Sequence, residues 1–417
     1  MMELHPRLQD AVATAERVAE PRLREIDRLI DANQWKTIQA FQKYKVSDFH
    51  FSGSTGYGYN DRGRETLDEV YAEVFGAEAG LVRPHFASGT HTIATALFGV
   101  LRPGDELLFI TGSPYDTLHK VIGTEGDGTG SLRDWGIRCT IVPLGADGRV
   151  DWDAVEAAWS PAVKVVAMQR SRGYEWRASF TVDELGEMTR RVKALNPDVI
   201  TFLDNCYGEF TEDREPTQVG VDLMAGSLIK NPGGGLAPTG GYIVGRKRLV
   251  ELAAYRLTAP GIGAEVGSML GTTRAIYQGL FLAPHAVGQA LKGAVFAAAL
   301  FDALGFVSNP KWDDPRSDII QAVRFDKASQ LIAFVQSVQR ASAVDAHVVP
   351  EPWDMPGYEH PVIMAAGTFI QGGSLELSAD APIREPYTAY MQGGLTFSHV
   401  KIGVVSAVQR MMEERIL

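Results

Sequence analysis

The sequence predicts an α/β protein built around a mostly parallel sheet, with a smaller α+β domain at its C-terminal end. Short apolar runs alternate with helical segments, as at 139–142, 152–159 and 163–168. This alternation is typical of parallel strands joined by right-handed crossovers. Another apolar run, 198–203, leads into an acidic residue, at the sheet edge where open α/β folds bind ligands. The chain of 417 residues is long enough for two domains with a large core.

Composition narrows the classes of protein and partner. The chain is 45% hydrophobic and 22% charged, which is ordinary for a soluble globular protein. Its net charge of −11 and the lack of a basic cluster argue against nucleic acid as a partner. No apolar run has the length of a membrane span, and the first residues lack the apolar core of a signal peptide. We therefore expect a cytoplasmic protein without a membrane partner.

The histidines and cysteines do not form a recognisable site. His85, His91 and His119 fit no metal-binding motif at helical spacing, and Cys139 and Cys206 form no CxxC pair. We therefore expect neither a metal ion nor a disulfide framework. Cys206 has no evident base beside it in the sequence, so we interpret it as a small buried hydrophobic residue.

Three segments are predicted along the chain. Residues 1–50 form an N-terminal helical arm, in which Pro21 separates two amphipathic helices. Residues 51–283 form a large domain that carries the alternation of strands and helices. Residues 284–417 form a small domain, which starts at an alanine-rich apolar helix over 284–304.

A carboxylate and a lysine follow two of the predicted strands. The strand that starts near 198 ends at Asp204, and a second apolar stretch leads to Ser227 and Lys230. Pro232 and three glycines come directly after the lysine, so it is presented from a turn rather than from a helix. This is the layout of enzymes that hold pyridoxal 5′-phosphate, in which the lysine forms a Schiff base and the carboxylate pairs with the ring nitrogen.

Two motifs around these residues carry a family resemblance. The stretches FLDNCYGEF at 202–210 and GSLIKNPGGG at 226–235 resemble fold-type I pyridoxal-phosphate enzymes of the cystathionine and methionine lyase group. More narrowly, they resemble the methionine γ-lyase-like family often called aluminium resistance proteins. The resemblance extends from about Phe51 to the C-terminus. It implies a PLP-dependent transferase-like fold, a cofactor-binding domain at 51–283 and a small amino-acid substrate.

A turn at 88–90 is a candidate phosphate site. Ser88, Gly89 and Thr90 open a predicted helix, whose free N–H groups and positive dipole end suit a phosphate. Serine and threonine are also the usual helix N-caps, and Asp204 and Lys230 are what favour the phosphate interpretation. The resemblance adds Ser227 to the cofactor-binding residues.

Tyr115 follows the strand predicted at 104–111. An aromatic residue at a strand end is most often there for packing. The resemblance implies that Tyr115 stacks on the cofactor ring and can act as an acid, which makes Lys230, Tyr115 and Asp204 the catalytic candidates.

The segment 49–64 is rich in glycine, tyrosine and arginine. Such a segment can be an ordinary long surface loop. In the resembling family it crosses to a neighbouring subunit and binds the phosphate there through a Tyr-x-Arg. Tyr57 and Tyr59 supply tyrosines, but Asp61 occupies the arginine position. Either Arg62 or Arg64 would then take the arginine's place. The implied assembly is a homo-oligomer, a dimer with shared sites that assembles further into a tetramer.

Arg384 and Arg172 are candidates for binding the substrate carboxylate. Arg384 follows a predicted strand and stands beside two prolines, and arginine is the natural bidentate partner of a carboxylate. The alternative is a surface salt bridge to Glu385 or Asp380. Arg172 lies in the polar stretch 169–174 after another strand end.

These residues together predict a PLP-dependent carbon–sulfur lyase. The reaction would be γ- or β-elimination on a sulfur amino acid such as methionine or cystathionine, giving a 2-oxo acid, ammonia and a thiol. One alternative is elimination or replacement on a non-sulfur γ-substituted amino acid. Another is a non-catalytic stress or metal-tolerance protein, against which Asp204, Ser227 and Lys230 argue.

Overall fold

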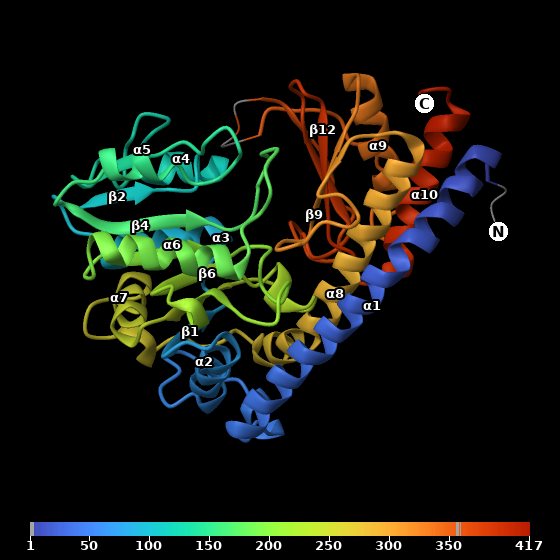
Figure 1. Ribbon diagram of the computed structural model, residues 1–417. Helices are drawn as coiled ribbons and strands as arrows, with labels where there is room; N and C mark the ends of the chain where they lie inside the picture. The colour runs from blue at the N-terminus through green and yellow to red at the C-terminus, as the bar shows by residue number, and fades with distance from the viewer. Residues whose placement is uncertain (1–3, 356–357, 359) are drawn as a thin grey trace.

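The predicted α/β fold is confirmed by a twisted, mostly parallel sheet at the centre of the large domain (Figure 1). The computed structural model describes residues 4–355, 358 and 360–417. Within these residues the sheet has the order β1-β7-β6-β5-β4-β2-β3. The pairs β1–β7 and β6–β7 are antiparallel and the other neighbours are parallel. The strands are β1 (Ala79–Arg83), β2 (Glu106–Phe109), β3 (Arg138–Ile141), β4 (Val163–Gln169), β5 (Ile200–Asp204), β6 (Leu223–Ser227) and β7 (Gly241–Gly245).

Helices cover both faces of this sheet because its strands are apolar on both sides. Along the second strand and the residue after it, Leu107 and Phe109 pack into one core, whereas Leu108 and Ile110 pack into the other. The first core includes side chains of α3 (Gly89–Val100), α4 (Asp116–Ile122) and α7 (Lys247–Leu257). The second includes side chains of α2 (Arg62–Phe75), α5 (Trp152–Ala157) and α6 (Val182–Leu195). This three-layer packing leaves the ends of the strands free to form a site.

Several helix ends follow from local sequence signals. Thr181 caps α6 and forms a capping box with Glu184, as predicted. Gly76 ends α2 in the left-handed conformation, with φ 65°. Asp61, which stands at the arginine position of the resembling family, is the N-cap of α2 and accepts a hydrogen bond from the backbone N–H of Arg64 at 3.0 Å.

The small domain is an antiparallel sheet with helices packed on it. Its strand order is β10-β11-β12-β9-β8, and each neighbouring pair is antiparallel. The strands are β8 (Ser308–Asn309), β9 (Ile320–Arg324), β10 (Val362–Ala365), β11 (Ser378–Pro382) and β12 (Thr388–Gln392), with helices α9 (Ala328–Arg340) and α10 (Phe397–Glu413). Short 3-10 helices elsewhere are η1 (Asp48–Phe51), η2 (Pro216–Val219), η3 (Asn231–Gly233) and η4 (Gly263–Glu265).

Two long helices join the domains, and both continue through a proline that the sequence analysis placed at an end. The prediction that Pro21 separates two helices is wrong, since α1 is a single helix over Pro6–Lys43. The helix predicted to begin at Pro284 begins earlier, so α8 spans Thr273–Leu304. Figure 1 shows α1 lying alongside α8 from the small domain to the large one. Burial of residues on both sides of each proline outweighs the roughly 3 kcal/mol that an interior proline costs.

By length and composition alone, α8 could also cross a membrane, although the sequence analysis found no run of that length. In this fold 78% of its most apolar window is buried inside the protein. This is the pattern of a core helix.

The two long helices are in close contact at Gly288 of α8. A Cβ atom added to Gly288 would collide with the side chain of Ile30 on α1. Glycine at this position therefore sets how near the N-terminal arm can come to α8.

We predict that Gly288→Ala lowers the free energy of unfolding by about 1–3 kcal/mol, the usual cost of overpacking a core. The loss is expected although alanine is intrinsically the better helix former by about 1 kcal/mol. Urea denaturation measures the effect. The control is the same change in an Ile30→Ala background, where the collision is gone and Gly288→Ala should be neutral or stabilising. Equal losses in both backgrounds would contradict this account of the packing.

Candidate active site

The candidate active site lies at the C-terminal ends of β4, β5 and β6, where a cavity of about 100 Å³ opens. Of the predicted site residues, five line this cavity together: Gly89, Thr90, Tyr115, Asp204 and Lys230.

Asp204 and Lys230 meet because they follow neighbouring parallel strands. Asp204 is the last residue of β5 and pairs with Ala225 of β6. Lys230 follows β6 and precedes the short 3-10 turn at Asn231–Gly233, so the turn predicted from Pro232 is confirmed. The lysine Nζ lies 4.1 Å from the centre of the Tyr207 ring. Both charged side chains are thus held over one side of the cavity.

The electrostatics of the pair follow from burial. Burial raises the pKa of Asp204 above its ordinary value, while the Lys230 ammonium and the Cys206 N–H act in the opposite direction. Burial likewise disfavours the charged form of Lys230, but the ionisable groups beside it, Cys206, Tyr207 and Asp204, hold its pKa above the ordinary value. The lysine is therefore protonated unless another group replaces the lysine beside Asp204.

The first turn of α3 has features that fit a phosphate. Ser88 caps this helix through its hydroxyl, which accepts from the His91 N–H at 3.1 Å, so the capping interpretation of Ser88 holds. The first N–H groups of the helix, at Gly89 and Thr90, face no carbonyl of a preceding turn. Ser227 lies opposite: its Cβ would be 3.4 Å from a Cβ placed on Gly89. The Ser227 hydroxyl is buried and has no hydrogen-bond partner among the described residues.

This donor set fits pyridoxal phosphate. An orphaned buried hydroxyl and a helix N-terminus suit the phosphate, a buried carboxylate suits the ring nitrogen, and a lysine suits the aldehyde carbon. Within the described part of the chain, no cluster of histidine, cysteine and acidic residues is arranged to hold a metal ion.

Tyr115 belongs to a cluster of tyrosines that closes the cavity toward the small domain. It precedes α4, and its backbone N–H donates to Gln169 Oε1 at 2.7 Å. Its hydroxyl lies 2.6 Å from that of Tyr358, and its ring centre is 5.7 Å from that of Tyr174. Burial raises the pKa of Tyr115 well above its ordinary value, so this hydroxyl keeps its proton and can donate it.

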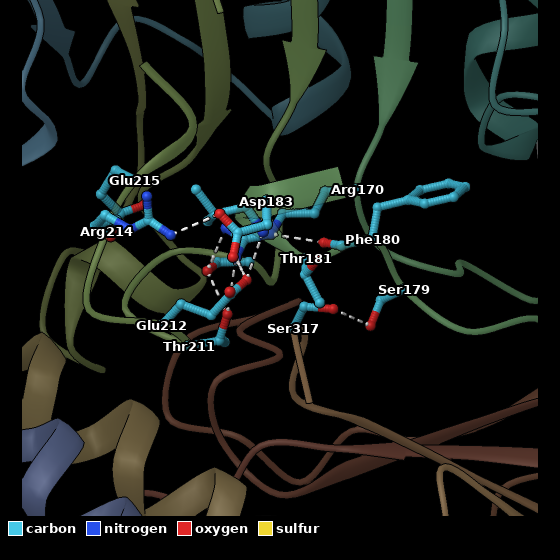
Figure 2. A network of polar contacts seen from close by, with 12 residues as sticks. Arg170, Ser179, Phe180, Thr181, Asp183, Thr211, Glu212, Arg214, Glu215 and Ser317 are labelled. Atoms are coloured by element: carbon cyan, nitrogen blue, oxygen red, sulfur yellow. Dashed lines mark hydrogen bonds and ion pairs between the residues drawn. The ribbon is translucent and has the colours of Figure 1, made fainter. Parts of the chain in front are cut away.

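The turn after Asp204 is held in an unusual conformation by Arg170. Tyr207 has φ 72°, and a Cβ on Gly208 would collide with the Arg170 side chain. The Arg170 guanidinium is buried, and Figure 2 shows it beside Phe180, Thr211 and Glu212. It donates to Asn205 Oδ1 at 3.0 Å, Gly208 O at 2.8 Å, Phe180 O at 3.3 Å, Thr211 Oγ1 at 3.3 Å and Glu212 Oε1 at 2.6 Å.

The loop predicted to bind phosphate does not reach the cavity of its own chain. Tyr57 and Tyr59 are 75% and 64% exposed, with ring centres 5.5 Å apart. Arg62 is exposed and makes a 3.5 Å ion pair with Glu65. Arg64 is fully buried and donates to three backbone carbonyls of its own subunit, Gly58 at 2.7 Å, Gly267 at 3.0 Å and Glu265 at 3.1 Å. Of the two arginines, only Arg62 presents its guanidinium outward.

The two arginines predicted to bind substrate lie outside the cavity. Arg172 is buried against the small domain, where it donates to Asn309 O at 2.8 Å and its Nε lies 3.8 Å from Asp318. Arg384 lines a neighbouring polar pocket and its Nη2 lies 3.9 Å from Glu175. The alternative predicted from the sequence was a salt bridge from Arg384 to Glu385 or Asp380, but the acid beside Arg384 is Glu175, which follows β4 of the large domain.

A second cavity, of about 220 Å³, continues from the first toward the small domain. Tyr115, Tyr207 and Lys230 line both cavities. The far wall comes from β10–β12 and the loop before β11, and it includes Tyr358, Asp380 and Gln392. The sequence analysis did not select these residues. Tyr207 stands in the motif after Asp204 and could have been found there, but the other three have no local signal.

Glu209 is a further buried carboxyl next to this turn. It is fully buried, its Oε1 accepts from the Tyr242 hydroxyl at 2.6 Å, and its Oε2 has no partner among the described residues. Burial raises its pKa to about 8, although the Tyr242 hydrogen bond lowers it. The carboxyl is therefore largely protonated at neutral pH.

Comparison with known proteins gives close matches over nearly the whole chain. The family model for methionine gamma-lyase matches residues 8–412. The uncharacterized protein YnbB of Bacillus subtilis (strain 168) is 58% identical over 395 residues, which are 94% of each chain. The crystal structure of a carbon-sulfur lyase involved in aluminum resistance from Clostridium novyi NT is 48% identical, covers 98% of this chain and 96% of its own, and superposes with a TM-score of 0.94.

A more distant structure shares the fold. The pyridoxal-5′-phosphate dependent protein YhfS from Escherichia coli is 16% identical to this chain, with a TM-score of 0.62 over 94% of this chain and 96% of its own. The predicted fold type is thereby confirmed.

We predict that Glu209→Gln changes how stability depends on pH. The folded pKa of about 8 is above the ordinary 4.5. The wild-type carboxyl therefore stabilises the fold fully below pH 4.5, and this contribution is lost as the pH rises through 8. Glutamine cannot ionise, so between pH 5 and 9 the melting temperature of Glu209→Gln should fall less than that of the wild type. Glu187→Gln, an exposed change on α6, is the control. Parallel profiles for Glu209→Gln and wild type would contradict the burial of a neutral carboxyl.

Proposed function

The chain belongs to the methionine gamma-lyase family as a pyridoxal 5′-phosphate-dependent carbon–sulfur lyase, and we propose that it performs γ- or β-elimination on a thioether amino acid such as methionine or cystathionine. The products would be a 2-oxo acid, ammonia and a thiol. One observation supports the proposal most directly. Lys230 and Asp204 follow adjacent strands and line the same cavity.

Five groups of the chain would hold the cofactor. The N–H groups at Gly89 and Thr90 and the free hydroxyl of Ser227 suit its phosphate. The carboxylate of Asp204 would keep a proton on the ring nitrogen, and Lys230 would bind the cofactor covalently. When bound, pyridoxal phosphate draws electrons from Cα of the substrate and makes its proton acidic.

The remaining residues would move protons on the substrate. The free amine of Lys230 would be the base that takes the Cα proton, since Lys230 lines both the first cavity and its continuation. Tyr115 is protonated, because burial raises its pKa, and its hydroxyl would supply a proton to the departing sulfur. Arg384 lines a polar pocket that shares Tyr358 with the second cavity, and it would meet the substrate carboxylate.

We further propose that the site is completed by a second copy of the chain. Tyr57 and Tyr59 are exposed, Arg62 points outward, and Leu270, 66% exposed, lies in the adjoining segment. A cluster of exposed aromatic and apolar side chains is typical of an interface. These residues would reach the phosphate of the neighbouring site in a homo-oligomer.

The test of the reaction is incubation of the cofactor-loaded protein with methionine, cystathionine and cysteine, with 2-oxo acid, ammonia and thiol measured. At least one substrate should be cleaved, and Lys230→Ala should lose turnover at least about a hundredfold. Lys247→Ala, an exposed lysine on α7, is the matched control and should retain it. Borohydride reduction and peptide mapping should find the pyridoxyl group on Lys230. A group on another lysine, or no oxo acid from any of the three substrates, would refute the proposal.

Sharing of the site is tested by mixing two inactive variants, Lys230→Ala and the double variant Tyr59→Phe with Arg62→Ala. In a mixed dimer with shared sites, one site carries both defects and the other carries none. Random exchange of equal amounts should therefore restore about a quarter of all sites. Subunit exchange is verified with a tagged copy. If exchange occurs and no activity returns, the loop serves its own subunit.

A further inference from the structure

The second cavity carries a single carboxylate that the proposed reaction does not use. Among the described residues that line this cavity, Asp380 is the only acidic one and Lys230 the only basic one. The small-domain wall also carries the polar side chains of Thr368, Ser378 and Gln392, together with the apolar side chain of Met364.

Asp380 is fixed in place by two hydrogen bonds to one of its oxygens. It lies on β11, opposite Tyr390 of β12. Its Oδ2 accepts from the Tyr174 hydroxyl at 3.1 Å and from Gln392 Nε2 at 3.0 Å. The described residues donate no hydrogen bond to Oδ1. One oxygen is therefore anchored, and the other is left for a ligand.

The charge of Asp380 is not neutralised by a salt bridge within the described chain. The ion pairs of the small domain involve other acids. The cation across the cavity is Lys230, which would be bound to the cofactor. Burial raises the pKa of Asp380, and the hydrogen bonds from Gln392 and Tyr174 lower it. Asp380 is half-buried, and a partly desolvated carboxylate without a cation favours a cationic ligand group that reaches it.

We propose that Asp380 recognises a protonated amino group on the leaving thiol of the substrate. The inference rests on the proposed carbon–sulfur cleavage and names its substrate class, thioether amino acids whose departing half bears an amine. A substrate lacking that amine leaves the Oδ1 of Asp380 unpaired in the cavity. Sites built around such a polar group discriminate strongly against analogues that cannot pair with it.

The first experiment compares two substrates that differ only in this group. In S-(2-aminoethyl)-L-cysteine the leaving thiol ends in an ammonium, and in S-propyl-L-cysteine a methyl takes its place. The homocysteine homologues form a second pair, so that γ- and β-elimination are both covered. For the holoenzyme we expect kcat/KM to favour the amine by at least about tenfold in the pair that is cleaved. No preference, or a preference for the propyl compound, overturns the proposal without need of any variant.

The second experiment assigns the preference to Asp380. In Asp380→Asn the ratio of the two kcat/KM values should fall close to one, because the negative charge is gone while the amide can still meet Tyr174. Asp326→Asn removes an exposed acid that follows β9 and does not line either cavity, and it should keep the ratio. An unchanged ratio in Asp380→Asn, with the cofactor bound at normal occupancy, overturns the assignment.

A binding measurement separates this inference from the proposed reaction. The α-methyl analogues of each pair lack the Cα proton and cannot undergo elimination, so calorimetry with the holoenzyme gives their Kd values. A tenfold tighter Kd for the amine that disappears in Asp380→Asn supports the recognition even if no thioether is cleaved, in which case the reaction alone is wrong. Equal Kd values, or no binding of either analogue, overturn the role of Asp380.

Discussion

The site depends on one buried cation, the guanidinium of Arg170. A fully desolvated guanidinium is stable only if its donors are satisfied. The turn and the residues after it, 205–212, supply most of the acceptors, and Figure 2 shows Thr211 and Glu212 among them. Arg170 and this turn therefore constrain each other. The turn has to bring its carbonyl and amide oxygens inward, which holds Tyr207 at a positive φ and leaves no space for a Cβ at Gly208. In that conformation the Cys206 N–H donates to Asp204 at 3.1 Å, and the Tyr207 ring lies against Lys230.

The parts of the site that could be predicted from sequence are those that depend on local pattern and on the rule for parallel strands. Asp204 and Lys230 each follow a short apolar run, and parallel pairing carries both to the same edge of the sheet. The turn at Lys230 follows from Pro232, and the cap of α3 follows from Ser88. None of these needed knowledge of a distant contact.

What could not be predicted depends on contacts between distant segments. Pro21 lies inside α1 because packing against α8 outweighs its local cost. Arg170 and Arg172 are two residues apart and equally polar, yet one supports the site turn and the other faces Asp318. Tyr358 meets Tyr115, and Asp380 meets Tyr174, across separations of 243 and 206 residues. No periodicity or motif records such pairs, since each partner is ordinary in its own neighbourhood.

The two domains therefore support different aspects of the same site. Residues at the strand ends of the large domain surround the first cavity, where Asp204, Lys230 and the start of α3 would hold the cofactor. Strands β10–β12 of the small domain form the far wall of the second, with Asp380. The boundary between the cavities is made of aromatic side chains, chiefly Tyr115 and Tyr207, that belong to both. The wall residues take no part in the Arg170 network. In the proposed reaction, side chains on β11 and β12 would therefore influence which leaving group fits, whereas Asp204 and Lys230 would set the type of reaction.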